Sequence, residues 1–386
     1  MIGSAVQTVP IEVRYCARCL EPTSRPGQNL DVSGICKPCR YVQSLDRVDW
    51  AERARQLQEI ADWGRSRRTG PYDCIIGVSG GKDSLRQAMY VRDILGLRAL
   101  LVCCAYPPEQ IAERGTRNLS NLVAQGFDLH FSSPGPQTWK TMLRIGFRDY
   151  AQWTRSSELA LFSSMPRVAT AFNIPLIFLG ENPALAFGAK TGGDGAEANS
   201  LRDYDTLSGA SLTPWIERGI PENKLFWYRF PSDEDIERLG LRMVYLGYFI
   251  RDFDDIHNTA FAKEHLFQPR EGRDADPTCT GSINPYESVD EDFVHVNQHL
   301  KSIKLGFGKV VQQVSVMVRH GAISREEALE LVRCYDGKVD RNLIERFCAY
   351  LEIDVEEFEI IVEQFRNRDL WQLNNQGQWE LRYAPR

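Results

Sequence analysis

The sequence has no long apolar run. Its most apolar stretch, LGLRALLVCCA at residues 95–105, is already interrupted by Arg98, so no segment resembles a membrane span. The first residues, MIGSAVQTVPIEVR, lack the basic-then-apolar plan of a secretory signal, and we find no internal repeat and no low-complexity segment. Ten cysteines without such a signal fit a reducing compartment better than a disulfide framework. These absences predict a cytoplasmic protein with no membrane partner.

An excess of positive charge is also missing. The chain has 46 Lys and Arg against 52 Asp and Glu, which gives a formal net charge of -6. This balance argues against a nucleic-acid partner bound through an overall basic surface, although a local basic patch is compatible with it. A hydrophobic content of 43% over 386 residues is that of a soluble globular chain with two or three domains.

The segment at residues 72–97 predicts an anion-binding turn. Residues 74–78 (CIIGV) are typical of a buried parallel strand, and residues 85–97 have the spacing of an amphipathic helix. Between them stands SGGKDS, at residues 79–84. Gly80 and Gly81 have no Cβ to block a ligand, so their N–H groups can point at phosphate oxygens, and the following helix adds its positive N-terminus. Lys82 supplies a positive charge, and Ser79 and Ser84 supply hydroxyl donors.

The spacing of this turn differs from that of the common phosphate loop. That loop has four residues between its first glycine and Gly-Lys, and Ser or Thr follows the lysine. Here only three residues lie between Gly77 and Gly81, and Asp83 follows Lys82. The turn instead resembles the SGGxDS loop of the PP-loop ATP pyrophosphatases, which cleave ATP between the α- and β-phosphates and activate a carbonyl oxygen as an adenylate. The alternative is an ordinary glycine turn between a strand and a helix.

Four cysteines near the start of the chain predict a metal site. Cys16 and Cys19 form one close pair, and Cys36 and Cys39 form another, in a C-x2-C-x16-C-x2-C pattern. Two tight turns with two sulfurs each can complete a tetrahedron around zinc, and four thiolates leave no open position for catalysis. We therefore expect structural Zn²⁺. An iron–sulfur cluster, a redox pair or free thiols are the alternatives.

The remaining pattern predicts a parallel sheet with helices on both faces. Further strands are expected at residues 99–104, 127–131, 174–179 and 244–250, separated by helices. The loops that follow three of these strands, at residues 79–84, 104–108 and 180–182, would meet at the carboxyl ends of the sheet, where such folds bind ligands.

The second half of the chain predicts a lid and a helical region. Residues 188–212, rich in Gly, Ala, Ser and Thr, directly follow the loop at residues 180–182, which favours a mobile active-site lid over an insertion. From about Asp254 the sequence is helical in character. Ser324 starts a capping box with Glu327, and Asp354 is a second helix start.

Several motifs together resemble the N-acetyl sugar amidotransferases of bacterial surface-polysaccharide synthesis, including the O-antigen enzymes and their pseudaminic and legionaminic acid relatives. They are YCARCLEPTSRPG at 15–27, GICKPC at 34–39, SGGKDS at 79–84, GENP at 180–183, IKLGFGK at 303–309 and RHGAISREEA at 319–328. The resemblance spans nearly the whole chain. It implies a four-cysteine zinc module at residues 1–48, a PP-loop ATP-pyrophosphatase domain at 49–253 and a mostly helical region at 254–386. In the lid, FGAKTGG at residues 187–193 departs from the family pattern, which leaves the sugar unassigned.

The resemblance also implies a reaction. ATP would attach AMP to the oxygen of an acetamido group on a nucleotide-linked sugar, and ammonia would then displace AMP to leave an acetamidino group. Lys82 and the amides of Gly80 and Gly81 would hold the leaving phosphates, and Asp83 would hold Mg²⁺. Gly180 is expected to contact ATP, and Glu181 and Asn182 to contact the sugar. No cysteine stands in an identifiable glutaminase setting, so ammonia should come from a separate glutaminase subunit, with a cyclase-like companion.

Two other functions fit parts of the pattern. A tRNA-modifying thiouridylase or lysidine-type ligase also joins an SGGxDS loop to zinc-binding cysteines, but the acidic balance counts against it. A regulatory nucleotide sensor with a protein-docking zinc module is the other, and the absence of pyrophosphate release would favour it.

Overall fold

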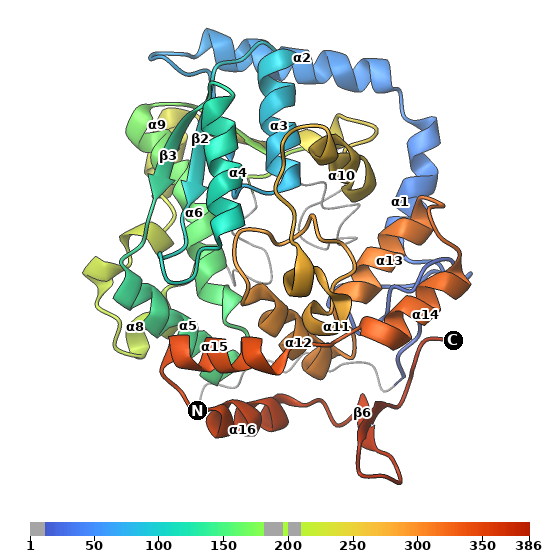
Figure 1. Cartoon of the computed structure of the whole chain (residues 1–386). Coiled ribbons are helices and arrows are strands. Elements are labelled where there is room, and N and C mark those ends of the chain that lie inside the picture. Colours follow the sequence, from blue (N-terminus) through green and yellow to red (C-terminus); the bar gives the residue numbers. More distant parts are fainter. Residues whose placement is uncertain (1–11, 181–195, 200–209) are drawn as a thin grey trace.

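The computed structural model describes residues 12–180, 196–199 and 210–386 (Figure 1). The predicted Glu181 and Asn182, and most of the glycine-rich segment at residues 188–212, lie outside these residues. No helix in the described part of the chain combines the length and the apolar character needed to cross a membrane.

A five-stranded parallel sheet forms the centre of the fold. Its strands are β1 (Cys74–Gly77), β2 (Ala99–Cys104), β3 (Asp128–Ser132), β4 (Leu176–Leu179) and β5 (Arg242–Tyr245). The order across the sheet is β3-β2-β1-β4-β5, and every neighbouring pair is parallel. The order reverses direction between β1 and β4, and in open sheets of this kind ligands bind beyond the carboxyl ends of the strands at such a reversal. The predicted α/β class is confirmed.

Alternating side chains along the strands pack against helices on both faces. Ile76 and Phe178 belong to one apolar cluster, which includes residues of α2 (Trp50–Ser66), α3 (Lys82–Asp93) and α4 (Glu113–Ala124). Ile75 and Ile177 belong to another, with α6 (Thr154–Phe172). Successive strand residues point to opposite faces, so a sheet covered on both sides requires the apolar runs found in the sequence.

Most of the predicted strands differ from the observed ones by one or two residues at their ends, and the last one differs most. The strand expected at residues 244–250 begins earlier, at Arg242, and ends at Tyr245, where a turn of 3₁₀ helix, Leu246–Tyr248, follows. The apolar run continues beyond the strand because Leu246, Phe249 and Ile250 are buried in the apolar cluster that includes α2, α3 and α4. A buried apolar run does not by itself distinguish a strand from a buried turn.

The second half of the chain is mainly helical, as predicted. Its helices are α8 (Thr213–Glu217), α9 (Asp233–Leu239), α10 (Asp255–Lys263), α11 (Pro277–Thr280), α12 (Val294–Leu305), α13 (Lys309–Arg319), α14 (Arg325–Tyr335), α15 (Arg341–Leu351) and α16 (Val355–Phe365). Both hydrogen bonds of the capping box at Ser324 are present, and Asp354 caps α16. The chain ends in a hairpin of β6 (Trp371–Leu373) and β7 (Trp379–Leu381), which was not predicted.

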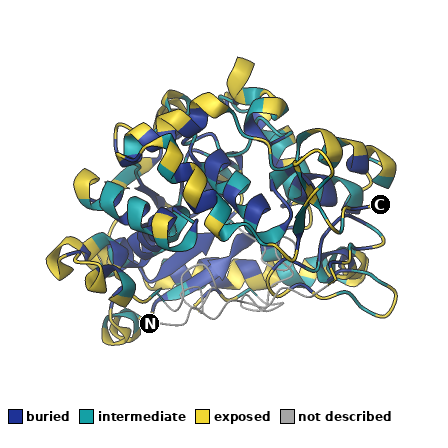
Figure 2. Ribbon diagram, turned by 90° about the horizontal axis from the view of Figure 1, so that it is seen from below, coloured by how far each residue is buried: buried dark blue, intermediate teal, exposed yellow. Residues whose placement is uncertain are grey.

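The C-terminal helices pack on helices from the sheet domain. Phe147 of α5 (Pro136–Tyr150) stacks on Phe358 of α16, with ring centroids 5.3 Å apart, and meets Phe347 of α15 edge-on. Figure 2 shows exposed residues on the outer faces of the helices and buried residues between the layers. Helices from both sides of residue 253 contribute side chains to one apolar cluster. The division of the chain at residues 48 and 253 stays a prediction.

The N-terminal segment packs on α13. Leu20 is buried with Val310 and Val314 of this helix, and Val318 contacts the cluster formed by the four N-terminal cysteines. In Figure 1, α1 (Lys37–Ser44) lies beside α13, and α2 leads from it across the sheet domain to β1. The cysteine module is therefore packed on a C-terminal helix, and α1 and α2 connect it along the chain to the sheet.

Candidate functional site

A cavity of about 350 Å³ opens at the carboxyl ends of β1 and β4, where the strand order reverses. This volume lies within the range of small-ligand sites. Three parts of the chain contribute to its lining: the sheet domain, the segment that begins α10, and the end of α13. The lining residues are Gly77, Val78, Ser79, Gly81, Asp83, Ser84, Gln87, Leu161, Phe162, Met165, Leu179, Gly180, Phe253, Asp254, Asp255, Asn258, Val316, Arg319 and His320.

The predicted loop forms one wall of this cavity. Gly80 has a φ of +82°, and an added Cβ would lie 2.9 Å from the carbonyl oxygen of Gly115, so the turn requires glycine here. Gly81 is the N-cap of α3, and no side chain caps that helix. The helix N-terminus therefore keeps N–H groups without a side-chain acceptor beside the cavity, where a phosphate could accept from them.

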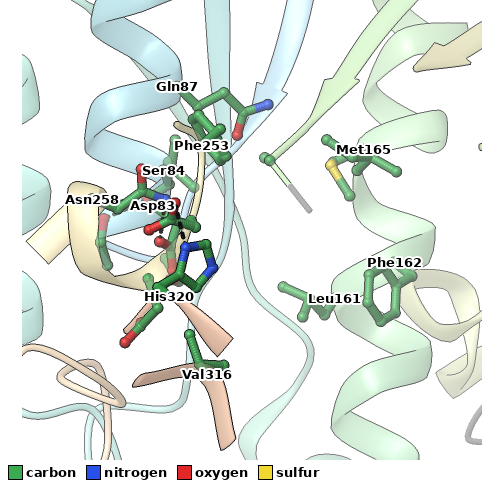
Figure 3. A pocket seen from close by; sticks show the side chains of 18 of the residues that line it. Asp83, Ser84, Gln87, Leu161, Phe162, Met165, Phe253, Asn258, Val316 and His320 are labelled. Carbon is green, nitrogen blue, oxygen red and sulfur yellow. Dashed lines mark hydrogen bonds and ion pairs between the residues drawn. The ribbon is translucent and has the colours of Figure 1, made fainter. Parts of the chain in front are cut away.

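The lining has a polar side and an apolar side. In Figure 3, Leu161, Phe162 and Met165 of α6 face Asp83, Ser84 and His320 across the cavity. An added Cβ on Gly77 would lie 2.3 Å from the sulfur of Met165, so glycine at the end of β1 makes room for this side chain. The arrangement suits a ligand with a flat apolar part and a charged part.

Gln87 and Gly180 meet at the sheet end of the cavity. An added Cβ on Gly180 would lie 2.9 Å from Oε1 of Gln87, so a larger residue here would force this side chain to shift. Gln87 is 1% exposed, and its Nε2 has no hydrogen-bond partner among the described residues. A buried amide donor without a partner is costly, and a ligand acceptor would satisfy it. Sequence reasoning placed Gly180 near the ligand but missed Gln87, whose only signal is its position one turn after Asp83.

Lys82 lies beneath the loop and is not among the residues that line the cavity. Its side chain is 3% exposed, and its Nζ lies 2.6 Å from Oδ1 of Asp255 and 3.1 Å from Oδ2 of Asp83. Burial lowers the pKa of Lys82, but the carboxylates of Asp83, Asp255 and Glu287 outweigh it and hold that pKa above its ordinary value. The ammonium group is therefore charged and held by acidic partners.

Asp83 is the predicted residue that reaches from this buried group into the cavity. Its side chain is 52% exposed, and its Oδ1 accepts a hydrogen bond of 2.6 Å from Nδ2 of Asn258. Oδ2 faces Lys82. Two fixed neighbours thus orient the carboxylate, and a carboxylate beside phosphate oxygens suits a hard cation such as Mg²⁺. Among the described residues, only the four cysteines form a group of at least three close ligands, so a magnesium ion here would also need ligand or water oxygens.

The acidic side chains below the loop interact with the ammonium groups of two lysines. Burial first, and then Glu287, raises the pKa of Asp255 to about 7. Burial alone would raise the pKa of Glu287 as well, but the ammonium groups of Lys309 and Lys82 hold it below its ordinary value. The arrangement favours a protonated Asp255 beside an ionised Glu287. Sequence reasoning missed this network, because its members come from α3, α10, α13 and the segment before α12.

The four predicted metal ligands lie together. The sulfurs of Cys16, Cys19, Cys36 and Cys39 are all within 4.8 Å of one another, and all four residues are fully buried. The Sγ atoms of Cys16 and Cys39 are 3.8 Å apart, and those of Cys19 and Cys36 are 3.7 Å apart. Four sulfurs about 2.3 Å from one zinc ion in a tetrahedron are about 3.8 Å from each other. The group therefore fits a single zinc ion, whereas a cluster with a different iron for each cysteine would hold the sulfurs farther apart.

The metal module and the cavity meet at Arg319. Its side chain is 2% exposed and lines the cavity, and its Nη1 lies 3.7 Å from Oε2 of Glu21. Its carbonyl oxygen accepts a hydrogen bond from Nη2 of Arg18, the residue before Cys19. The end of α13 is thus held on one side by the cysteine module and presents its other side to the cavity.

One predicted loop does not reach the cavity. Residues 104–108 after β2 are absent from its described lining, whereas residues 79–84 and Gly180 contribute to it. The sequence could not predict the contributions of Asp254, Asn258 and His320, which come from regions far along the chain.

Residues 281–385 match the family model for the C-terminal domain of WbpG-like LPS biosynthesis proteins. This match fits the resemblance to the N-acetyl sugar amidotransferases. The matched region contains α13 and therefore three residues of the cavity wall, Val316, Arg319 and His320. No curated protein matches the chain.

Proposed function

We propose that the protein is an ATP-dependent amidotransferase of bacterial lipopolysaccharide biosynthesis. In this proposal it converts the acetamido group of a nucleotide-linked sugar to an acetamidino group, with AMP and pyrophosphate as the other products. The observation that carries the proposal is the SGGKDS loop, which lines the cavity at the reversal of the sheet. The match of the C-terminal region to an LPS biosynthesis family supports the pathway.

The cavity offers separate surfaces for the parts of ATP. The start of α3 and the hydroxyls of Ser79 and Ser84 suit the phosphates, because they combine N–H and O–H donors with a positive helix end. The apolar side chains of α6 suit the adenine ring, and Gln87 offers a hydrogen-bond donor. Asp83 would hold Mg²⁺, which would supply positive charge to neutralise the phosphates.

Lys82 takes part from below the loop in this proposal. The sequence predicts that it holds the leaving phosphates, and this stays a prediction. Its contacts with Asp83 and Asp255 support a second role, which is to orient the carboxylate of Asp83 and to place a positive charge under the phosphates. Both roles make the charge of Lys82 necessary.

The chemistry follows from the weakness of an amide as an electrophile. Transfer of AMP to the amide oxygen converts that oxygen into a good leaving group, and pyrophosphate departs. Ammonia then attacks the amide carbon, and AMP leaves with the former amide oxygen. The described chain offers no glutaminase site that we can identify, so we propose that a glutaminase subunit, with a cyclase-like companion, delivers the ammonia.

Mass spectrometry of the products tests the proposal. Purified protein is incubated with Mg²⁺, ATP, an ammonium salt and a panel of UDP- and CMP-linked N-acetyl sugars. We expect AMP, pyrophosphate and a sugar in which NH replaces one O, in equal amounts. Absence of AMP with every sugar of the panel would reject the proposal, and ATP-dependent modification of tRNA would favour the alternative enzyme class.

A further inference from the structure

Two helix ends bring an aspartate and a histidine together in the cavity wall. His320 follows the last residue of α13, and Asp254 is the N-cap of α10. Nδ1 of His320 lies 3.9 Å from Oδ2 of Asp254. Both residues line the cavity, and the side chain of Asp254 is only 6% exposed. The two residues are far apart in the sequence, so only the fold brings them together.

Asp254 is held rigidly. Its Oδ1 accepts hydrogen bonds of 3.0 Å from the N–H groups of Ile256 and His257, which fixes the carboxylate at the start of α10. Its Oδ2 accepts from Nδ1 of His257 at 2.7 Å and faces His320 from the other side. A carboxylate fixed in this way can orient an imidazole, as in other aspartate–histidine pairs.

The surroundings of His320 favour a neutral imidazole at neutral pH. Burial lowers its pKa, and Asp254 opposes this effect. The positive charges of Arg319 and Arg18, and His257 when it is protonated, lower it further. A proton on Nδ1, the nitrogen that faces the carboxylate, would leave the lone pair of Nε2 free. In Figure 3, one ring nitrogen of His320 points across the cavity, toward Leu161. Nε2 is therefore a base that opens into the space where a ligand would lie.

We propose that His320, oriented by Asp254, is the general base of the ammonia step, an inference that rests on the proposed function. Ammonia attacks the carbon whose oxygen carries AMP. Its lone pair forms the new C–N bond, and its nitrogen becomes positively charged. Nε2 of His320 accepts a proton from that nitrogen, and the C–O bond breaks with its electron pair going to AMP. The proton then leaves to solvent or to AMP, and the amidine remains. The gap of 3.9 Å between Nδ1 and Asp254 is compatible with this role, since such contacts often tighten only with ligand bound.

The chain offers a matched control for this assignment. His257 contacts the same oxygen of Asp254 but is 51% exposed and does not line the cavity among the described residues. His257→Gln therefore removes this imidazole on the side away from the ligand, while the glutamine amide can still donate a hydrogen bond to the carboxylate and keep Asp254 oriented.

The test separates the two halves of the reaction. With the nucleotide sugar found active above and Mg-ATP, but without ammonia, the first pyrophosphate released reports on adenylation. Addition of ammonium salt at fixed pH reports on amidine formation. We expect His320→Gln to slow amidine formation about 100-fold and to change the pyrophosphate burst less than about 3-fold. Asp254→Asn, which keeps the helix cap, should slow only the second half, and His257→Gln should resemble the wild type.

Two outcomes would overturn the assignment. An equal loss in both halves would make His320 a ligand-positioning residue. Normal amidine formation by His320→Lys, which introduces a positive charge and offers no neutral imidazole, would show that only a cation is needed.

A spectroscopic measurement tests the pair without the reaction. In protein labelled with ¹⁵N-histidine, the signal of His320 is the one that is missing from His320→Gln. We expect this signal to show an imidazole protonated at Nδ1. Asp254→Asn should change the balance between the two tautomers. If the wild type makes no AMP with any sugar, the proposed function fails, while this measurement still decides whether the pair exists. A tautomer protonated at Nε2 would contradict the pair even in an active enzyme.

Discussion

Asp83 is the residue at which the buried charges beneath the loop meet the cavity. One of its oxygens is held by Asn258 and the other faces Lys82, so the side chain is oriented although half of it is exposed. A replacement by Asn preserves the shape and removes the charge that a magnesium ion needs. We expect Asp83→Asn to lower pyrophosphate release at least about 100-fold. The thermal midpoint should stay close to that of the wild type.

Asp93, at the other end of the same helix, gives the control for this prediction. Its side chain is partly exposed and forms an ion pair with its neighbour Arg92. Asp93→Asn should leave pyrophosphate release unchanged. Equal activity of the Asp83 and Asp93 variants would remove Asp83 from the active site.

Asp255 gives a pH dependence with a definite sign. Its pKa is about 7 in the folded protein against an ordinary value of 3.8, so between these values the folded chain holds a proton that the unfolded chain has lost. Stability contributed by this group therefore falls as the pH rises through that window. Compared with Asp255→Asn, the wild type should lose about 2 kcal/mol in its free energy of unfolding between about pH 5 and pH 7. Urea titrations at several pH values measure this, and parallel curves for the two proteins would contradict the shift.

At the scale of elements, local patterns predicted what local interactions determine. The strand of residues 99–104 and the capping box at Ser324 were found where the sequence placed them, and the turn expected at residues 79–84 is present but ends earlier, because α3 begins at Lys82. Glycines, alternating apolar residues and cap residues act on their own neighbourhood, and they can be recognised without the fold. The end of β5 was predicted less well, because burial continues past the last strand hydrogen bond.

Contacts between distant elements could not be predicted in this way. Asp254, Asn258 and His320 reach the cavity because α10 and α13 pack at the carboxyl end of the sheet. No spacing of residues in the sequence indicates that these two helices pack there. The same holds for Lys82, whose residue type suggested a phosphate contact and whose surroundings place it among carboxylates.

The end of helix α13 contacts the metal module and also lines the cavity. The cysteine cluster contacts Val318, and the next two residues, Arg319 and His320, line the cavity. Structural metal binding is coupled to folding. We expect one zinc ion per wild-type chain. Cys36→Ser should lose this ion, lower the thermal midpoint by about 10 °C or more, and weaken ATP binding.

Cys334 supplies the control for the metal, since it is exposed on α14. Cys334→Ser should retain both zinc and stability. Elemental analysis that finds iron or no metal in freshly purified wild type would contradict the zinc assignment.

At the scale of the whole molecule, the question is where ammonia comes from. Ammonia is mostly protonated at neutral pH and is then not nucleophilic, so direct delivery by a partner would be an advantage. We expect the isolated chain to turn over with concentrated ammonium salt at raised pH and not with glutamine. Product formation is measured with each nitrogen source, and efficient use of glutamine by the chain alone would point to a glutaminase site within it.

The central claim is that AMP is transferred to the amide oxygen of the sugar, and the fate of that oxygen tests it most directly. A nucleotide sugar labelled with ¹⁸O in its acetamido carbonyl is incubated with the protein, Mg-ATP and ammonium salt, and the products are analysed by mass spectrometry. The account predicts that every amidine formed leaves one ¹⁸O atom in AMP, with none in pyrophosphate. Label in inorganic phosphate, or AMP without label beside an amidine product, would contradict it.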